Sequence, residues 1–158
     1  MNKYLAKYGF QSPKITSIPN ENLGIVIVIP CHNEENVTRT LNSLKVCSPA
    51  QCLVKTIIVI NQSEVVAEQI AVQNHKSEAE IHNWKQENPE MDVDVIFEKA
   101  LPKKHAGDGL ARKIGMDEAI NLFYQIEKDG IIVALDADCL VEPNYLQAIE
   151  SHFIQNPT

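Results

Sequence analysis

The chain has 158 residues, of which 44% are hydrophobic and 22% are charged, and its formal net charge is −7. This length suits one domain with a substantial hydrophobic core. An acidic chain lacks the excess of lysine and arginine that nucleic acids and anionic membranes attract, so we expect no nucleic-acid partner. No apolar run reaches the roughly 20 residues that span a bilayer, and the first residues lack the apolar core of a signal peptide. We therefore expect a cytoplasmic protein without a transmembrane segment, free or peripheral at the inner face of a membrane.

Residues 1–23 are polar and contain two prolines, and we expect a leader that packs on the domain or is partly disordered. After it, short runs rich in β-branched residues predict four strands, at 24–30, 54–60, 92–98 and 130–136. Apolar residues at helical spacing, or runs of polar helix formers, predict four helices, at 35–46, 64–88, 110–128 and 144–155. Strands and helices thus alternate, which predicts an α/β fold with a mostly parallel sheet and helices on both faces. We expect residues 24–158 to form this single domain.

The last predicted strand ends in two aspartates, Asp136 and Asp138, with one alanine between them. If strand geometry continues to Asp138, both carboxylates point to the same side. They also lie at the carboxyl end of the strand, where open α/β sheets bind ligands. A divalent cation is the simplest partner for two neighbouring carboxylates, and oxygen ligands favour Mg²⁺ or Mn²⁺. The competing interpretation is that Asp136 caps the following turn and that Asp138 is a solvated loop acid.

Polar residues also follow the first two predicted strands, as CHNEE at 31–35 and as NQS at 61–63. Asn33 and Asn61 can each donate and accept hydrogen bonds, as recognition of a base or a ribose requires. Asparagine is also a common helix cap and turn residue, so capping is the competing interpretation.

A basic loop with small residues, KKHAGDG at 103–109, precedes the third predicted helix. Free backbone N–H groups at a helix start, together with Lys103, Lys104 and His105, suit a phosphate group. Neither of the two common glycine-rich phosphate motifs is present, and a solvated basic loop is the competing interpretation.

Taken together, four stretches resemble family-2 inverting glycosyltransferases of the GT-A fold. They occur in the family's order and read IVIVIPCHNEENVTRTLNSL, IIVINQS, HAGDGLARKIGMDEA and GIIVALDADCLVEPNYLQAI. The resemblance covers about residues 24–150 and implies the N-terminal, nucleotide-sugar-binding half of a Rossmann-like GT-A domain, truncated after the D-x-D motif. It implies a nucleotide-diphosphate sugar as donor, with UDP-sugars favoured. The acceptor would be a saccharide, a lipid or a protein, and transfer would invert the sugar.

The resemblance implies nucleotide-sugar contacts for residues that follow the strands, namely Pro30, His32, Asn33, Glu34, Asn61, Ser63, His105, Gly107, Asp108 and Asp136. The first four match the P-x-x-N-E segment, which lies against the nucleoside. Asn61 stands where the family usually has an acid that reads the base. The segment from His105 to Asp108 resembles the family's K-A-G-N. Asp136 and Asp138 match the D-x-D motif, which binds the diphosphate through Mn²⁺ or Mg²⁺.

An inverting transfer also needs a general base that deprotonates the acceptor hydroxyl. In the family this acid lies further along the chain than the D-x-D motif, so the resemblance places it beyond Thr158. We therefore expect this polypeptide alone to transfer sugar weakly or not at all. One alternative is a non-catalytic nucleotide-sugar-binding module. Another is a phosphatase in which the first aspartate of D-x-D is the nucleophile, although that motif normally lies on the first strand.

Overall fold

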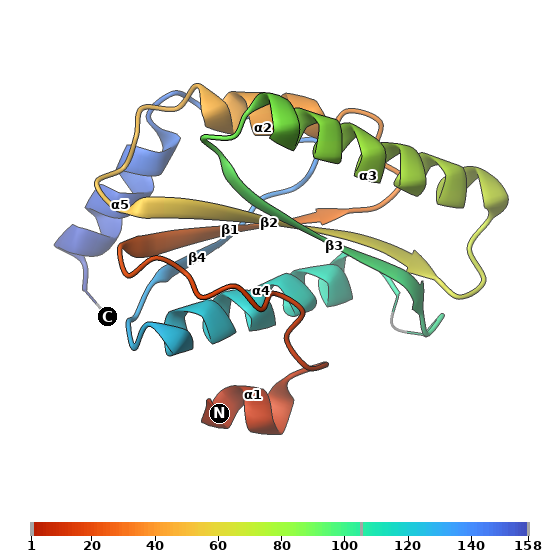
Figure 1. The fold of residues 1–158 in the computed structure, drawn as a ribbon, viewed down its shortest axis with the longest axis horizontal. Coiled ribbons are helices and arrows are strands. Elements are labelled where there is room, and N and C mark those ends of the chain that lie inside the picture. The colour runs from red at the N-terminus through yellow and green to blue at the C-terminus, as the bar shows by residue number, and fades with distance from the viewer. Residues whose placement is uncertain (1, 105, 158) are drawn as a thin grey trace.

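The computed structural model describes residues 2–104 and 106–157. Within these residues, four strands form one parallel sheet in the order β3-β2-β1-β4 (Figure 1). The strands are β1 (Leu23–Cys31), β2 (Leu53–Ser63), β3 (Asp92–Leu101) and β4 (Ile131–Ala134). The helices are α1 (Lys3–Tyr8), α2 (Val37–Lys45), α3 (Glu68–Glu87), α4 (Asp108–Gln125) and α5 (Tyr145–Gln155). The predicted α/β fold with helices on both faces of a parallel sheet is confirmed.

The core has two layers because β1 is buried on both faces. Ile25, Ile27 and Ile29 face a cluster that α2, α3 and α5 complete. Val26 and Val28 face a second cluster, which α4 closes on the other side of the sheet (Figure 1). This two-sided burial explains why the strand reads as a continuous apolar run rather than as an alternating one.

All four strands end at residues other than those predicted: β1 and β3 continue to Cys31 and Leu101, and the other two differences lie near the expected site residues. β2 continues to Ser63, because Asn61 and Ser63 still align with residues of β3. β4 ends at Ala134, earlier than expected, so the two aspartates follow the strand instead of closing it. The backbone N–H of Leu135 donates to Val28 O at 3.0 Å, and Pro30, two residues further along β1, has no N–H to extend this ladder.

The N-terminal segment contains a helix, α1, that the sequence pattern did not predict. Its Asn2 side chain accepts from the backbone N–H of Tyr4 at 2.8 Å and so caps the helix. The chain then crosses α4, where Phe10 N donates to Asp117 Oδ2 at 3.0 Å and Lys14 N donates to Glu118 Oε1 at 2.6 Å. Burial raises the pKa of Glu118 above its ordinary value, although the backbone N–H groups of Lys14 and Ile15, which donate to its carboxylate, oppose this. No helix among the described residues is both long and apolar enough to cross a membrane.

The close approach of α4 to the sheet depends on Gly115. A Cβ atom there would lie 2.3 Å from Val28 Cγ1 and 3.2 Å from Val59 Cγ2, and both valines are fully buried. We expect Gly115→Ala to lower the free energy of unfolding by about 1–3 kcal/mol, because the buried, β-branched valine side chains cannot move away from the added methyl group. Gly109→Ala, in the first turn of the same helix, meets no atom of the described residues within 4 Å and should leave stability unchanged or raise it by up to about 1 kcal/mol. Urea unfolding of both variants checks this, and equal losses would contradict it.

Glu150 fastens α5 to the segment that enters β2. Its carboxylate accepts from the backbone N–H groups of Gln51 at 2.9 Å and Cys52 at 2.8 Å. The Gln51 N–H, followed by that of Cys52, holds the pKa of Glu150 below its ordinary value of 4.5, although burial opposes this.

A depressed pKa means that this stabilisation is present above about pH 4.5 and is lost as the pH falls through the lower folded-state pKa. We expect Glu150→Gln to lower the free energy of unfolding at neutral pH by about 1–2 kcal/mol, because the amide replaces one acceptor oxygen. The difference between the two proteins should shrink as the pH is lowered. Urea unfolding at a series of pH values measures the difference in unfolding free energy. A difference that grows as the pH falls would contradict the prediction.

Candidate functional site

A cavity of about 200 Å³ opens at the carboxyl ends of the strands, between the segments that follow β1 and β4 and the start of α4. It is lined by Pro30, His32, Glu34, Asp108, Arg112, Asp136, Ala137 and Asp138. Six of these residues were expected from the sequence, and they come from three separate stretches of the chain. The parallel topology therefore brings most of the predicted site together.

Both aspartates of the D-x-D segment line this cavity even though β4 has already ended. Leu135 and Ala137 are 8% and 7% exposed, whereas Asp136 and Asp138 are exposed, so buried and exposed residues still alternate although Ala137 and Asp138 already form a turn. Thr40 Oγ1 donates to Ala137 O at 2.6 Å, and Cys139 N donates to Asp136 O at 3.1 Å. These bonds hold the segment extended for two residues and then turn it. The Asp136 carbonyl, rather than its carboxylate, closes that turn.

Arg112 is the lining residue that the sequence reasoning missed. Its guanidinium donates to Asp136 Oδ1, and it lies four residues after Asp108, on the same face of α4. This spacing from an expected site residue is the signal that could have found it. The guanidinium neutralises one of the two D-x-D carboxylates.

The charges of the lining residues favour a cation. Glu34, Asp108, Asp136 and Asp138 bring four carboxylates to the cavity, against the single guanidinium of Arg112. Such an excess of carboxylates attracts a divalent ion. Yet nowhere in the described residues do three His, Cys, Asp or Glu side chains come close enough to hold a metal ion by themselves. A cation here would take its other ligands from water or from a bound phosphate.

Two residues at the end of β1 and directly after it, Cys31 and His32, have restricted chemistry: Cys31 is a poor nucleophile, and a hydrogen bond holds the His32 ring in one orientation. Burial, and then the nearby charges of Glu34 and Asp108, raise the pKa of the Cys31 thiol to about 12. His32 Nδ1 lies 2.8 Å from Asn61 O. A carbonyl oxygen only accepts, so Nδ1 carries a proton and, in a neutral ring, Nε2 is the acceptor.

Asn33 and Asn61 are not among the residues that line the cavity. Asn33 has a left-handed backbone (φ 51°), and its N–H donates to Asn74 Oδ1 at 2.8 Å, as suits a turn residue. Asn61 is fully buried, and its Nδ2 donates to Cys31 O at 3.3 Å. That bond orients the amide, because Cys31 O cannot donate. Among the described residues, Asn61 Oδ1 has no partner, and a buried acceptor in this state marks a place for a ligand or water.

The other expected residues lie at the edge of the cavity or away from it. Gly107 is the N-cap of α4 with φ 145°, a conformation that suits only glycine, and the described atoms leave its α-carbon open to space. Ser63 Oγ accepts from Val65 N at 3.2 Å and so closes the turn after β2. His105 falls outside the described residues.

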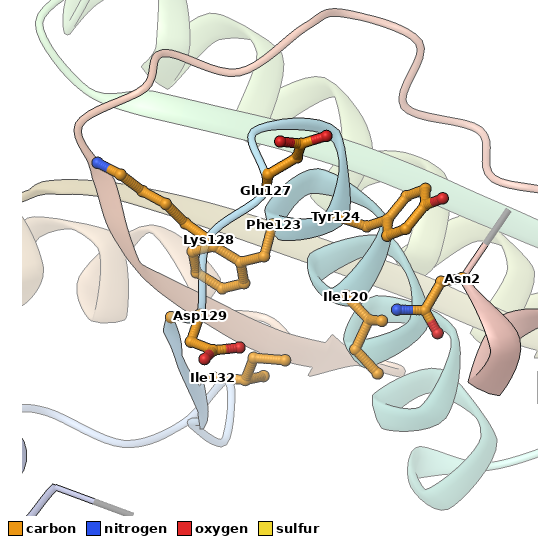
Figure 2. A pocket seen from close by; sticks show the side chains of 9 residues that line it. Asn2, Ile120, Phe123, Tyr124, Glu127, Lys128, Asp129 and Ile132 are labelled. Atoms are coloured by element: carbon orange, nitrogen blue, oxygen red, sulfur yellow. The ribbon is translucent and has the colours of Figure 1, made fainter.

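A second cavity, of about 350 Å³, lies at the opposite end of the sheet, where β4 begins. Figure 2 shows Phe123, Lys128 and Asp129 around it, on the end of α4 and on the turn that follows. Open α/β sheets bind ligands at the carboxyl ends of their strands, so the smaller cavity at the D-x-D segment is the better candidate.

Two solved structures share this fold at low sequence identity. One is the crystal structure of S. aureus TarS, with 12% identity and a TM-score of 0.53 over 84% of this chain and 20% of that one. The other is the crystal structure of S. aureus TarS 1-349, with 13% identity and the same TM-score over 84% of this chain and 33% of that one. This chain thus has a Rossmann-like glycosyltransferase fold and spans about a fifth and a third of those chains. No family model matches the chain, and no curated protein is significantly similar to it in sequence.

Arg112 contributes charge to the cavity more than stability to the fold. The side chains of Arg112 and Asp136 are 37% and 55% exposed, and ion pairs at such positions stabilise little. We expect Arg112→Ala to change the free energy of unfolding by less than about 1 kcal/mol.

Lys55→Ala is the contrast, because Lys55 is 7% exposed and bonds Asp92 and Asp94 at 2.6 and 2.7 Å. It should lose about 2 kcal/mol or more. Urea unfolding measures both variants. A loss of unfolding free energy for Arg112→Ala as large as that for Lys55→Ala would assign Arg112 a structural role.

Proposed function

We propose that this chain carries the donor site of an inverting, family-2-like glycosyltransferase. The observation that carries the proposal is the cavity that gathers Asp136, Asp138 and four other expected residues at one edge of the sheet. A glycosyltransferase-like fold agrees with it. The ligand would be a nucleotide-diphosphate sugar.

Asp136 and Asp138 would hold a Mn²⁺ or Mg²⁺ ion that also binds the diphosphate. Within the part of the chain that the structure describes, no third side chain comes close enough to complete a metal site with these two carboxylates. An ion of this type takes its other oxygens from phosphates and water. When bound, the ion would supply Lewis-acid stabilisation of the departing diphosphate. The acidic lining explains why the anionic donor would need a cation in order to enter.

Two groups of this chain would bind the diphosphate directly. Arg112 presents a planar guanidinium, whose paired N–H groups match phosphate oxygens. The start of α4, with Gly107 as its N-cap, presents backbone N–H groups and the positive end of the helix. In the described structure Arg112 instead pairs with Asp136, so donor binding would exchange this ion pair for contacts with metal and phosphate.

The base preference would depend on Asn61. Its amide is oriented by Cys31 O, which leaves Oδ1 as an acceptor and matches a base with a ring N–H, such as uracil. Guanine also carries a ring N–H, so GDP is the natural comparison. This role requires the fully buried Asn61 side chain to become accessible when the nucleoside enters.

The complete transfer reaction is proposed for the whole protein. An acceptor saccharide, lipid or protein and a general base complete an inverting transfer. The fold neighbours are three to five times longer than the part that aligns with this chain. The experiment that tests the proposal therefore measures donor binding rather than turnover.

We expect UDP to bind the purified chain in the presence of Mn²⁺ and to bind at least about tenfold more weakly in a chelator. Asp138→Asn should weaken the Mn²⁺-dependent binding to a similar degree, because the amide is neutral. Isothermal titration calorimetry measures both effects, and GDP is titrated in parallel.

Asp129→Asn is the matched control, since Asp129 is an exposed acid at the opposite cavity (Figure 2). It should leave the affinity unchanged. If the affinity for UDP depends neither on the metal nor on Asp138→Asn, the cation is removed from the proposal. The absence of any binding of UDP or GDP would refute the donor site in this chain.

A further inference from the structure

The loop after β1 is held from behind by polar side chains of α3. Ser77 Oγ and Gln73 Nε2 donate to Glu34 O at 2.7 and 3.0 Å. Between them on the helix, Asn74 accepts from the backbone N–H of Asn33 through Oδ1, at 2.8 Å. Asn74 and Ser77 are fully buried, whereas Asn33 is exposed and Glu34 is half-buried, so each of these two side chains joins the interior to the backbone of a more exposed loop.

Asn74 differs from its neighbours because its amide also reaches β2. Its Nδ2 donates to Asn61 O at 3.2 Å and to Gln62 Oε1 at 3.1 Å. Both N–H groups and the carbonyl oxygen of one side chain are therefore engaged. One buried amide thus joins the loop after β1 to the end of the neighbouring strand.

The same contacts reach the cavity through His32. The Asn61 carbonyl oxygen that accepts from Asn74 also accepts from His32 Nδ1, at 2.8 Å. Asn33 adopts a left-handed conformation with φ 51°, which needs support in a residue that carries a side chain. In this turn the Asn33 N–H faces α3, while the side chains of His32 and Glu34 line the cavity.

We propose that Asn74 is the positioning residue of the donor cavity. It touches no ligand itself, and acts by fixing the turn that aims His32 and Glu34 at the nucleotide. An apolar side chain at this position would remove the partner of Asn33 N–H and would leave Oε1 of the buried Gln62 without its donor, and the turn would relax to satisfy them. The effect on nucleotide affinity rests on the proposed function, whereas the effect on the turn does not.

The first measurement needs no ligand. In the wild-type chain the Asn33 amide should exchange with solvent slowly, and in Asn74→Ala it should exchange at least about tenfold faster. Amide hydrogen exchange by NMR measures both rates. Fast exchange of Asn33 in the wild-type protein would overturn the inference without the use of any variant.

The second measurement compares nucleotide affinity between two buried asparagines. Asn74→Ala should weaken Mn²⁺-dependent UDP binding by about tenfold or more, as the loss of a supporting contact does in other metal sites. Asn88→Ala is the control, because Asn88 is 5% exposed and its Nδ2 donates to Trp84 O at 2.7 Å, at the far end of α3. Asn88→Ala should lose comparable thermal stability and keep its UDP affinity within about twofold.

The outcomes separate this inference from the proposed function. UDP binding by wild type that Asn74→Ala retains within about twofold would refute the positioning role and leave the donor site standing. A wild-type chain that binds no nucleotide, yet shows the predicted Asn33 exchange, would refute the donor site and keep the role of Asn74 in the turn. If Asn74→Ala does not fold, Asn74→Ser replaces it, because its hydroxyl can bond some of the groups that Asn74 leaves. A loss of UDP affinity of about tenfold in Asn74→Ser would support the positioning role, and retention within about twofold would refute it.

Discussion

The parallel pairing of β1 with β2 and β4 is the constraint on which the site depends. Parallel strands bring their carboxyl ends to one edge, so the segments after β1 and β4 meet there although they lie about a hundred residues apart. β1 is buried on both faces, which leaves polar side chains no place before the strand ends. Pro30 marks this end, because it cannot donate to β4. The two aspartates then emerge from the sheet beside His32 and Glu34.

The electrostatics of the cavity follow from this convergence. Several carboxylates gather in a chain that is already acidic. Burial raises the pKa of Cys31 to about 12, and the negative charges of Glu34 and Asp108 act in the same direction. Arg112 offsets part of this negative charge through its ion pair with Asp136. The carboxylates of this lining repel phosphate and attract a cation. The proposed requirement for a metal is therefore a property of the lining as a whole, beyond the presence of D-x-D.

The sequence predicted the fold better than the boundaries of the site. β-branched runs located the strands, and their alternation with helices predicted the parallel sheet. The early end of β4 depends on Pro30 in another strand, which no local pattern in residues 130–136 could show. Arg112 was missed for a related reason, since its role arises only when α4 packs beside the D-x-D segment. Asn61 was expected after β2 but lies within it, because pairing with β3 extends the ladder.

Asn74 shows most clearly what a residue pattern cannot reveal. The buried positions of α3 are Asn74, Ser77, Ile81 and Trp84, which share one face at helical spacing. The first two meet the backbone of the loop after β1, and the last two meet the apolar core. A helix that buries polar groups at one end and apolar groups at the other carries no clear amphipathic signal, so it reads as solvated throughout. Where a helix passes from the core to the edge of a binding site, its inward face must change from apolar to polar, because the groups that it covers change from side chains to backbone.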